Sequence, residues 1–411
     1  MARSRRDVGL LFATRIIRMF AYGALSVVLA LYLAEIGLDE KRIGLLFTLT
    51  LVGDAVVTLA ITTSADRLGR RRSLMLGGAL MALAGTVFLM TRQPALLLVA
   101  AIIGVISPSG NEIGPFLSIE QAGLSQTLPD KRRTHVFAWY NLAGSVATAT
   151  GALCGGLLVQ ALQNGGLTPL NAFRAVLLVY ALCGFLLIIG FFTMSPAVEL
   201  SSTAEVLSVR SRFGLHRSGR IVLRLSALFA LDAFAGGFVI QSIVAYWFFT
   251  QFGLSPAALG TIFFAANLLA GVSALLAARI AARFGLINTM VMTHLPSNVL
   301  LCLVPLMPTL PLAIAVLLAR FSISQMDVPA RQSYTMAVVS PDERSAASGV
   351  TAIARSVGAS ISPWLSGLLL AAGFVAAPFL LAGGLKIVYD LLLYRSFRRM
   401  KTPEEAVSDA S

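Results

Sequence analysis

Charged and amide side chains stand inside long apolar stretches of this chain, where they could bind a polar solute or a proton. A charged group at the middle of a bilayer costs about 2.5 to 3.5 kcal/mol on insertion scales, so each one needs a partner or nearby water. Both signs of charge occur at such positions. The candidates for a binding or coupling site are Arg15, Arg18, Tyr22, Asp54, Asn111, Glu112, Tyr140, Asn141, Asp232, Gln241, Asn267, Arg320, Ser324, Asp327 and Arg355.

The spacing of some candidates places them on one helix face. At 100° per residue, four polar residues of the stretch 308–338 form a single stripe: Arg320, Ser324, Asp327 and Arg331. The same count puts Arg15, Arg18 and Tyr22 on one face near the N-terminus. A polar stripe that faces the axis of a helix bundle is what a solute path requires.

These groups also have simpler interpretations. Arg320 and Asp327 could neutralise each other, or pair with Glu112 and Arg355, as structural ion pairs. Asp54 and Asp232 lie at mid-depth of their stretches without an obvious local partner, a position that favours proton binding.

The elements that must hold these residues are membrane-spanning helices. Of the 411 residues, 57% are hydrophobic and 12% charged, and the mean hydropathy is +0.83, values that exclude a single soluble core. A spanning helix needs about 20 apolar residues. The predicted helices are 9–36, 43–64, 73–91, 95–127, 134–163, 171–195, 221–250, 256–281, 287–305, 308–338, 345–371 and 374–397.

Basic residues are concentrated in alternate loops. If odd-numbered helices run outward, the inner segments hold most of the 32 basic residues, and the outer loops hold only Lys41, Arg42 and Arg92. This bias predicts a multi-pass protein of the plasma or inner membrane with both termini in the cytoplasm. The net charge of +13 therefore reflects topology and contact with anionic lipids, and does not predict nucleic-acid binding.

Short motifs recur half a chain apart. Gly37 and Arg67 are repeated as Gly253 and Arg283, each 216 positions later. We therefore expect an all-α integral membrane protein of 12 transmembrane helices in two parallel-repeat six-helix bundles. The bundles would be residues 1–196 and 221–411, the second with a short cytoplasmic tail, joined by a cytoplasmic linker at 197–220.

The segment Asp66-Arg67-Leu68-Gly69-Arg70-Arg71 follows the second predicted helix. It resembles the cytoplasmic loop G-x-x-x-D-R-x-G-R-R/K of the major facilitator superfamily, although Thr62 stands where that pattern begins with glycine. The resemblance extends to the twelve spans, the duplication and the linker. It implies a transporter whose halves rock between two states, and it makes this loop a gate.

The gating candidates combine that loop with two residues nearer the cytoplasmic ends of their helices. They are Asp66, Arg67, Gly69, Arg70, Arg71, Glu120 and Arg331. The alternative for the loop arginines is that they only set orientation.

The resemblance also implies which helices line a central cavity. Helices 1, 2, 4, 5, 7, 8, 10 and 11 carry nearly all the embedded polar groups, so helices 3, 6, 9 and 12 would face lipid. The exceptions on the latter are Arg174, His294, Lys386 and Asp390. Pro108, Pro115 and Pro329 predict kinks in helices 4 and 10.

The function predicted from these observations is secondary active transport of a small organic solute. An anionic or zwitterionic solute fits the basic groups that outnumber the central acids, and protons fit as the coupling ion. Alternatives are efflux of amphipathic drug-like compounds, with Glu112 and Asp327 as counter-charges, or a lipid flippase. Helix 5 lacks the proline of the antiporter motif, and helix 4 lacks the arginine common in drug exporters, which argues against a drug–proton antiporter.

Other classes of protein are not predicted. The chain has no G-x-x-x-x-G-K-[ST] loop for a nucleotide, no H-E-x-x-H and no Ser-His pair for an enzyme, and its cysteines are too far apart for a metal cluster. We expect no cofactor, no metal and no nucleic acid. The expected partners are a small-molecule substrate, protons and the lipid bilayer, and a monomer is expected.

Overall fold

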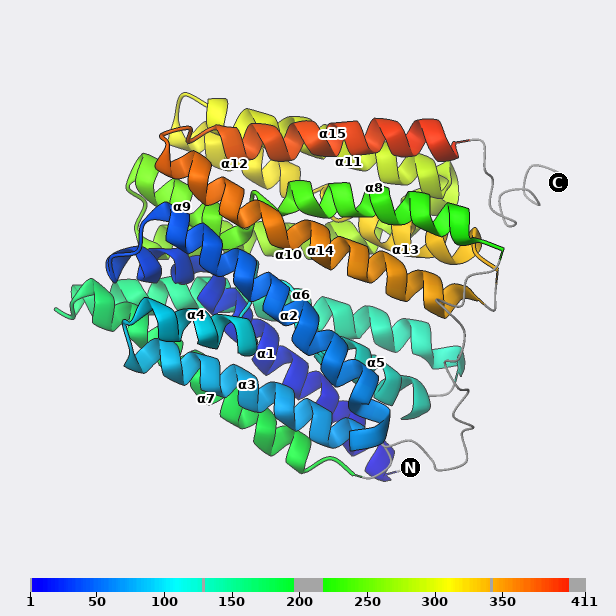
Figure 1. Cartoon of the computed structure of the whole chain (residues 1–411), viewed down its shortest axis with the longest axis horizontal. Coiled ribbons are helices and arrows are strands. Elements are labelled where there is room, and N and C mark those ends of the chain that lie inside the picture. Colours follow the sequence, from blue (N-terminus) through cyan, green and yellow to red (C-terminus); the bar gives the residue numbers. More distant parts are fainter. Residues whose placement is uncertain (1, 128–129, 196–216, 341–342, 399–411) are drawn as a thin grey trace. The chain divides into compact units, whose positions relative to one another are not determined.

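The structure is a computed structural model that describes residues 2–127, 130–195, 217–340 and 343–398. These residues form helices and no β-strand (Figure 1). Nine of the described helices are long and apolar enough to cross a membrane, and Pro94–Ile103 and Leu310–Phe321 are shorter apolar helices. The all-helical membrane architecture is confirmed, and the number of twelve crossings stays a prediction.

The first part of the chain contains seven α-helices. They are α1 (Ala2–Glu35), α2 (Glu40–Leu68), α3 (Arg70–Met90), α4 (Pro94–Ile103), α5 (Phe116–Thr127), α6 (Asp130–Asn164) and α7 (Pro169–Phe192). The second part contains α8 (Gly219–Gly237), α9 (Gln241–Phe252), α10 (Pro256–Phe284), α11 (Leu286–Leu303), η2 (Val304–Leu306), α12 (Leu310–Phe321), α13 (Asp327–Ala337), α14 (Arg344–Ala371) and α15 (Ala377–Phe397).

The chain divides into two compact units. The first comprises Met1–Val206 and Ile240–Asn267, and the second comprises Leu207–Val239 and Leu268–Ser411. The division falls within one apolar span, between α8 in the second unit and α9 in the first, where Ile240 has extended backbone. The two bundles predicted from the sequence, with a linker at 197–220, stay a prediction, and residues 196–216 lie outside the described ranges.

The repeat seen in the sequence motifs also appears in the helix ends. α10 begins and ends 216 residues after α2 begins and ends. Gly69 ends α2 with φ 90°, and Gly285 ends α10 with φ 80°. Glycine adopts such positive φ angles without strain, which explains why both joints carry it.

The fourth predicted helix is interrupted, so the expectation of one continuous helix over 95–127 is wrong, although its prolines predicted a kink. α4 ends at Ile103 and α5 begins only at Phe116. Gly110 and Gly114 between them have φ angles of 70° and 79°. Irregular backbone at membrane depth is tolerated where protein or water satisfies its polar groups, and most residues of this break are buried in the protein.

The tenth predicted helix is also interrupted, and here the expectation of one continuous helix over 308–338 is wrong. α12 ends at Phe321 and α13 begins at Asp327, with turns between them. Pro329 has no N–H to donate to the carbonyl of Gln325, so the helix cannot continue regularly through this point. The single stripe calculated from Arg320 to Arg331 is therefore split between two helices.

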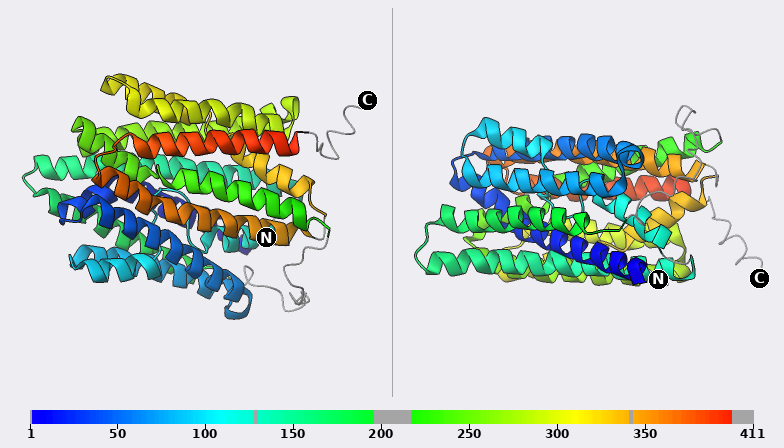
Figure 2. Two further views of the ribbon diagram at one scale, coloured as in Figure 1. Left: turned by 45° about the horizontal axis from the view of Figure 1, so that its top comes forward. Right: turned by 90° about the horizontal axis from the view of Figure 1, so that it is seen from below.

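Glycine allows α6 to lie directly against α1 in the first unit (Figure 2). A Cβ atom on Gly151 would stand 2.0 Å from the backbone oxygen of Phe20, and one on Gly23 would stand 2.0 Å from that of Thr148. Small residues permit this close approach of membrane helices. The glycines that the sequence places along helix 5 thus serve helix packing.

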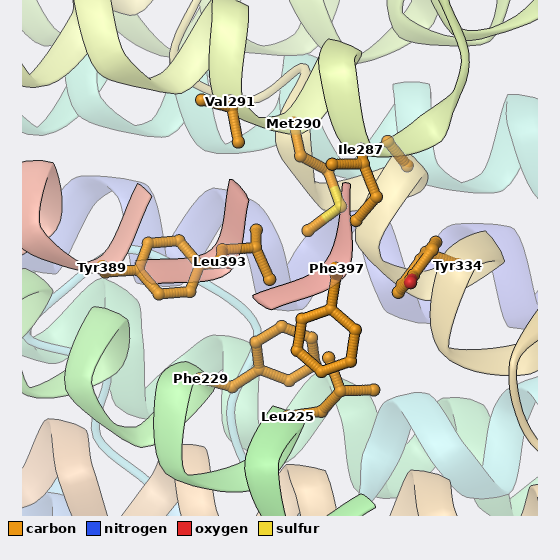
Figure 3. Packing of buried hydrophobic residues seen from close by; sticks show 10 residues of the cluster. Leu225, Phe229, Ile287, Met290, Val291, Tyr334, Tyr389, Leu393 and Phe397 are labelled. Carbon is orange, nitrogen blue, oxygen red and sulfur yellow. The ribbon is translucent and has the colours of Figure 1, made fainter. Parts of the chain in front are cut away.

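The second unit has its own apolar core, at one end of its helices (Figure 3). Residues from α8, α11, α13 and α15 meet there. They include Leu225, Phe229, Ile287, Met290, Tyr334, Tyr389, Leu393 and Phe397. This packing fixes the four helices that carry most of the charged groups of the unit.

Candidate functional site

Arg18 of α1 is the centre of a buried ion network in the first unit. Its Nη1 and Nη2 atoms donate to the two carboxylate oxygens of Glu120 at 2.8 and 2.7 Å. Its Nε donates to Oε1 of Glu112 at 2.8 Å. Arg18 and Glu120 are both completely buried. This two-pronged geometry is the strongest arrangement of an arginine and a carboxylate.

Arg15 extends the same network. Its Nη1 lies 2.9 Å from Oε2 of Glu112, and its Nη2 donates to Oδ1 of Asn141 at 3.4 Å. Its guanidinium lies over the ring of Tyr140, whose hydroxyl donates to Glu120 at 2.5 Å. The two arginines and two glutamates balance one another, so this network has no surplus charge. Glu120, which was grouped with the gating residues, belongs to this network through Arg18 and Tyr140.

Asp54 of α2 is held differently from the other acids of the first unit. It accepts a hydrogen bond from the backbone N–H of Gly114 at 2.8 Å and one from Thr58 Oγ1 at 3.4 Å. Among the described side chains it forms no ion pair. Asp54 therefore holds the break between α4 and α5 with a half-buried carboxylate that has no cationic partner.

Two polar candidates from the second half of the sequence, Gln241 and Asn267, belong to the first unit. Gln241 Nε2 donates to Ser26 Oγ at 2.8 Å, and Asn267 Nδ2 donates to Gln241 Oε1 at 3.2 Å. Ser242 Oγ donates to the backbone oxygen of Ser26 at 2.7 Å. We call Ser26, Gln241, Ser242 and Asn267 the serine seam.

Two further candidates of the first unit, Tyr22 and Asn111, belong neither to the Arg18 ion network nor to the serine seam. Tyr22 stacks on Tyr180 with ring centroids 6.3 Å apart. Asn111 exposes its side chain within the α4–α5 break. The unit also has a pocket of about 640 Å³ between α1, α6 and α7, whose lining is mostly apolar and includes no acidic or basic side chain.

Asp232 of α8 is surrounded by cations in the second unit. Lys386 Nζ of α15 lies 2.5 Å from its Oδ1. Arg331 of α13 and Arg355 of α14 each place Nη1 at 3.1 Å from its Oδ2. The sequence shows no local partner for Asp232 because its cationic partners come from helices far away in the sequence.

A second acid of this unit, Asp390, binds a histidine and an amide. Nδ1 of His294 lies 2.8 Å from Asp390 Oδ1, and Asn298 Nδ2 donates to Asp390 Oδ2 at 2.8 Å. Nε2 of His294 lies 3.8 Å from Asp232 Oδ1, which links the two clusters. All these side chains except Arg355 are buried.

The sequence did not indicate His294, Lys386 and Asp390 as site residues, because helices 9 and 12 were expected to face lipid. That interpretation is wrong at these positions, since the three side chains are buried against Asp232 and one another. The spacing of His294 to Asn298 and of Lys386 to Asp390 could have indicated that these polar side chains face protein rather than lipid. In each pair the residues are four apart and share a helix face.

The cations of this network outnumber its carboxylates. Asp327 pairs with Arg331 at 3.2 Å rather than with Arg320. Among the described residues, the guanidinium of Arg320 lies within electrostatic range of Asp232 and Asp327 without an ion pair, and its buried Nε has no hydrogen-bond partner. The four cations are Lys386, Arg320, Arg331 and Arg355, and the three carboxylates are Asp232, Asp327 and Asp390.

The gating loop is described only in part. Gly69 forms the joint between α2 and α3 with φ 90°, and Arg70 is buried. The guanidinium of Arg71 lies over the ring of Phe192 at 4.9 Å. The side chains of Asp66 and Arg67 lie outside the described residues. Arg331, the remaining gating candidate, lies in the Asp232 network.

The Major Facilitator Superfamily model matches residues 11–323 and 225–411. The chain belongs to this superfamily. An uncharacterized membrane protein of Saccharomyces cerevisiae, YJR124C, is 33% identical to this superfamily member over 417 residues, which cover 94% of this chain and 93% of the yeast protein.

Two solved superfamily structures share the fold. A variant of the nucleoside transporter NupG has a TM-score of 0.75 at 13% identity, over 95% of this chain and 99% of that one. The human organic anion transporter MFSD10 (TETRAN) has a TM-score of 0.63 at 19% identity, over the same shares. This superfamily member is therefore a multi-pass membrane transporter of small molecules and not an enzyme.

Proposed function

We propose that the transported solute is a small organic anion or zwitterion, bound by the Asp232 network. The observation that carries the proposal is the surplus of cations over carboxylates around Asp232. Arg355 is the accessible member of the network, with 34% of its side chain exposed, whereas the other side chains paired with Asp232 are 10% exposed or less.

An anion would complete the bonding of this network. A surplus charge inside a membrane protein is costly unless a counter-charge arrives. Arginine offers parallel N–H donors that match a carboxylate or a phosphate. The buried Nε of Arg320 and Oγ of Ser324 lack hydrogen-bond partners, so they are further donors for the same ligand.

The first unit is a weaker choice for an anion. Arg15 and Arg18 were candidates from the sequence, but both guanidinium groups are in ion pairs with Glu112 or Glu120 that balance their charge, although the Nε of Arg15 has no hydrogen-bond partner among the described residues. The alternative of drug-like cation efflux meets the same difficulty. Its counter-charges, Glu112 and Asp327, are both paired with arginines, and a cation would have to break those pairs.

We also propose that protons drive the transport. Asp54 and His294 are groups that could take up a proton without losing an arginine or lysine partner. The fold shared with the human organic anion transporter is compatible with the proposed substrate class. At 19% identity, this likeness shows a common fold and does not show a common substrate.

Topology and location complete the proposal. Because basic residues are concentrated in the segments predicted to face inward, both termini would lie in the cytoplasm and the protein in the plasma or inner membrane. The two predicted bundles would act as a monomer.

Uptake into proteoliposomes tests the substrate class. We expect labelled organic anions to enter by counterflow, and Arg355→Gln to lower the rate at least tenfold. Arg224→Gln removes an exposed arginine of α8 and is the matched control. If organic cations or lipids move while anions neither move nor compete, the proposal is wrong.

A further inference from the structure

We infer that His294 binds the proton that is transported together with the anion. The inference rests on the proposed anion transport and assigns its coupling site. His294 lies on α11, one of the helices expected to face lipid, yet its ring is buried between the carboxylates of Asp390 and Asp232.

The contacts of the ring fix where the proton goes. Nδ1 lies 2.8 Å from Asp390 Oδ1 and 3.1 Å from Nδ2 of Asn298; because a carboxylate can only accept, we assign the hydrogen of the neutral ring to Nδ1, which then donates to Asp390. Nε2 then has a free lone pair. It faces Asp232 Oδ1 at 3.8 Å, just beyond hydrogen-bond length. A proton on Nε2 would therefore gain a carboxylate partner after a small movement.

All the helices packed around α11 contribute charged groups to this environment. α8 contributes Asp232, α13 contributes Asp327 and Arg331, and α12 contributes Arg320. From α15 come Asp390 and Lys386, together with the ring of Tyr389. Arg355 of α14 reaches the same carboxylate, Asp232, from the exposed side.

Protonation of His294 would change the bonding of Asp232. A charged imidazolium would compete with Lys386 for Oδ1, since both groups approach that oxygen. Asp232 would then pair with His294 on its buried side, and its ion pair with Arg355 would weaken. Arg355 could turn toward an incoming anion, and the network would carry one more positive charge to attract it.

The coupling that follows is symport. One proton and one anionic group bind together, because each lowers the electrostatic cost of the other, and both leave on the other side. Imidazole suits this role, since it is the side chain that most readily gains and loses a proton near neutral pH.

The binding experiment uses the purified full chain and a labelled organic anion that counterflow has identified. We expect the wild type to bind this anion at least tenfold more tightly at pH 5.5 than at pH 7.5. His294→Gln keeps a donor for Asp390 but cannot take up a proton. It should bind the anion equally at both pH values, keep counterflow exchange and lose accumulation driven by a proton gradient.

The matched control is the double variant His135→Gln, His216→Gln, which replaces the only other histidines of the chain. It should retain the pH dependence and the proton-driven accumulation. With ¹⁵N-histidine it also leaves one imidazole signal, which should titrate and shift when the anion is added.

The outcomes separate the two proposals. If the wild type transports anions with a pH dependence that His294→Gln retains, the anion function stands and the assignment of His294 is overturned. If neither pH permits anion binding, the proposed function fails and the coupling site fails with it. An imidazole signal that does not titrate between pH 5 and 8 would also overturn the assignment.

Discussion

Ser26 and Ser242 occupy equivalent positions of the two repeats and bind each other directly. They are 216 residues apart, the same distance that separates the ends of α2 from those of α10. The hydroxyl of Ser242 donates to the backbone oxygen of Ser26 at 2.7 Å. These two residues meet in the serine seam of the first unit.

The seam depends on the amide of Gln241. Gln241→Leu should remove one partner from Ser26 Oγ, which keeps its bond to the backbone oxygen of Gly23, and the partner of the half-buried Asn267 amide. We expect a loss of about 1 to 3 kcal/mol of stability, measured as a lower melting temperature in detergent. Gln251→Leu, at an exposed position of the same helix, is the control and should change little. Equal effects of both substitutions would contradict the role of the seam.

The close contact of α6 with α1 leaves no room for a methyl group. Gly151→Ala should place Cβ within 2.0 Å of the Phe20 backbone oxygen and force the helices apart. We expect about 1 to 3 kcal/mol of destabilisation, read as reduced yield and melting temperature. Gly9→Ala, where a Cβ would meet nothing within 4 Å, serves as the comparison. A stable Gly151→Ala protein would show that the packing is looser than described.

Asp54 provides a test of where the proton binds. Asp54→Asn keeps an oxygen that can accept from the N–H of Gly114, so the break between α4 and α5 should survive. Because we assign the coupling to His294, uptake by this variant should keep the pH profile of the wild type. Loss of the pH dependence together with normal counterflow would assign the proton to Asp54 instead.

Removing the carboxylate of Asp232 should make the protein depend on its ligand. Asp232→Asn leaves Lys386, Arg331 and Arg355 without their shared counter-charge, and breaking a buried pair costs about 3 to 5 kcal/mol. A bound anion would replace part of that charge. Added anionic substrate should therefore raise the melting temperature of Asp232→Asn more than that of the wild type. Equal shifts in both proteins would place the anion elsewhere.

Much of the fold could be predicted from the sequence because membrane helices are long, apolar and separated by polar loops. A kink near Gly110 and Gly114 was also foreseeable, since glycine and proline cluster there, but the full interruption of the helix was not. The break between Phe321 and Asp327 was not foreseen. Pro329 indicated a kink, but the turn that replaces a regular helix depends on neighbouring helices.

The partners of the charged groups were harder to predict than the groups themselves. Arg331 and Asp327 are four residues apart on one helix, so the sequence carried enough information for that pair. The contacts of Asp232 with Lys386 and Arg355 join three helices, and no spacing within one helix contains them. Long-range ion pairs require the packing of the bundle, which the sequence pattern does not specify.

Because α8 and α9 belong to different units, the apolar span Gly219–Phe252 contributes residues to both of them. Its first part carries Asp232 and its second part carries Gln241, with Phe238, Val239 and Ile240 between them. Phe238 and Ile240 are buried, so this connection is packed backbone outside regular helix. A substitution at Asp232 and one at Gln241 would therefore disturb different units, although both residues lie in the same span.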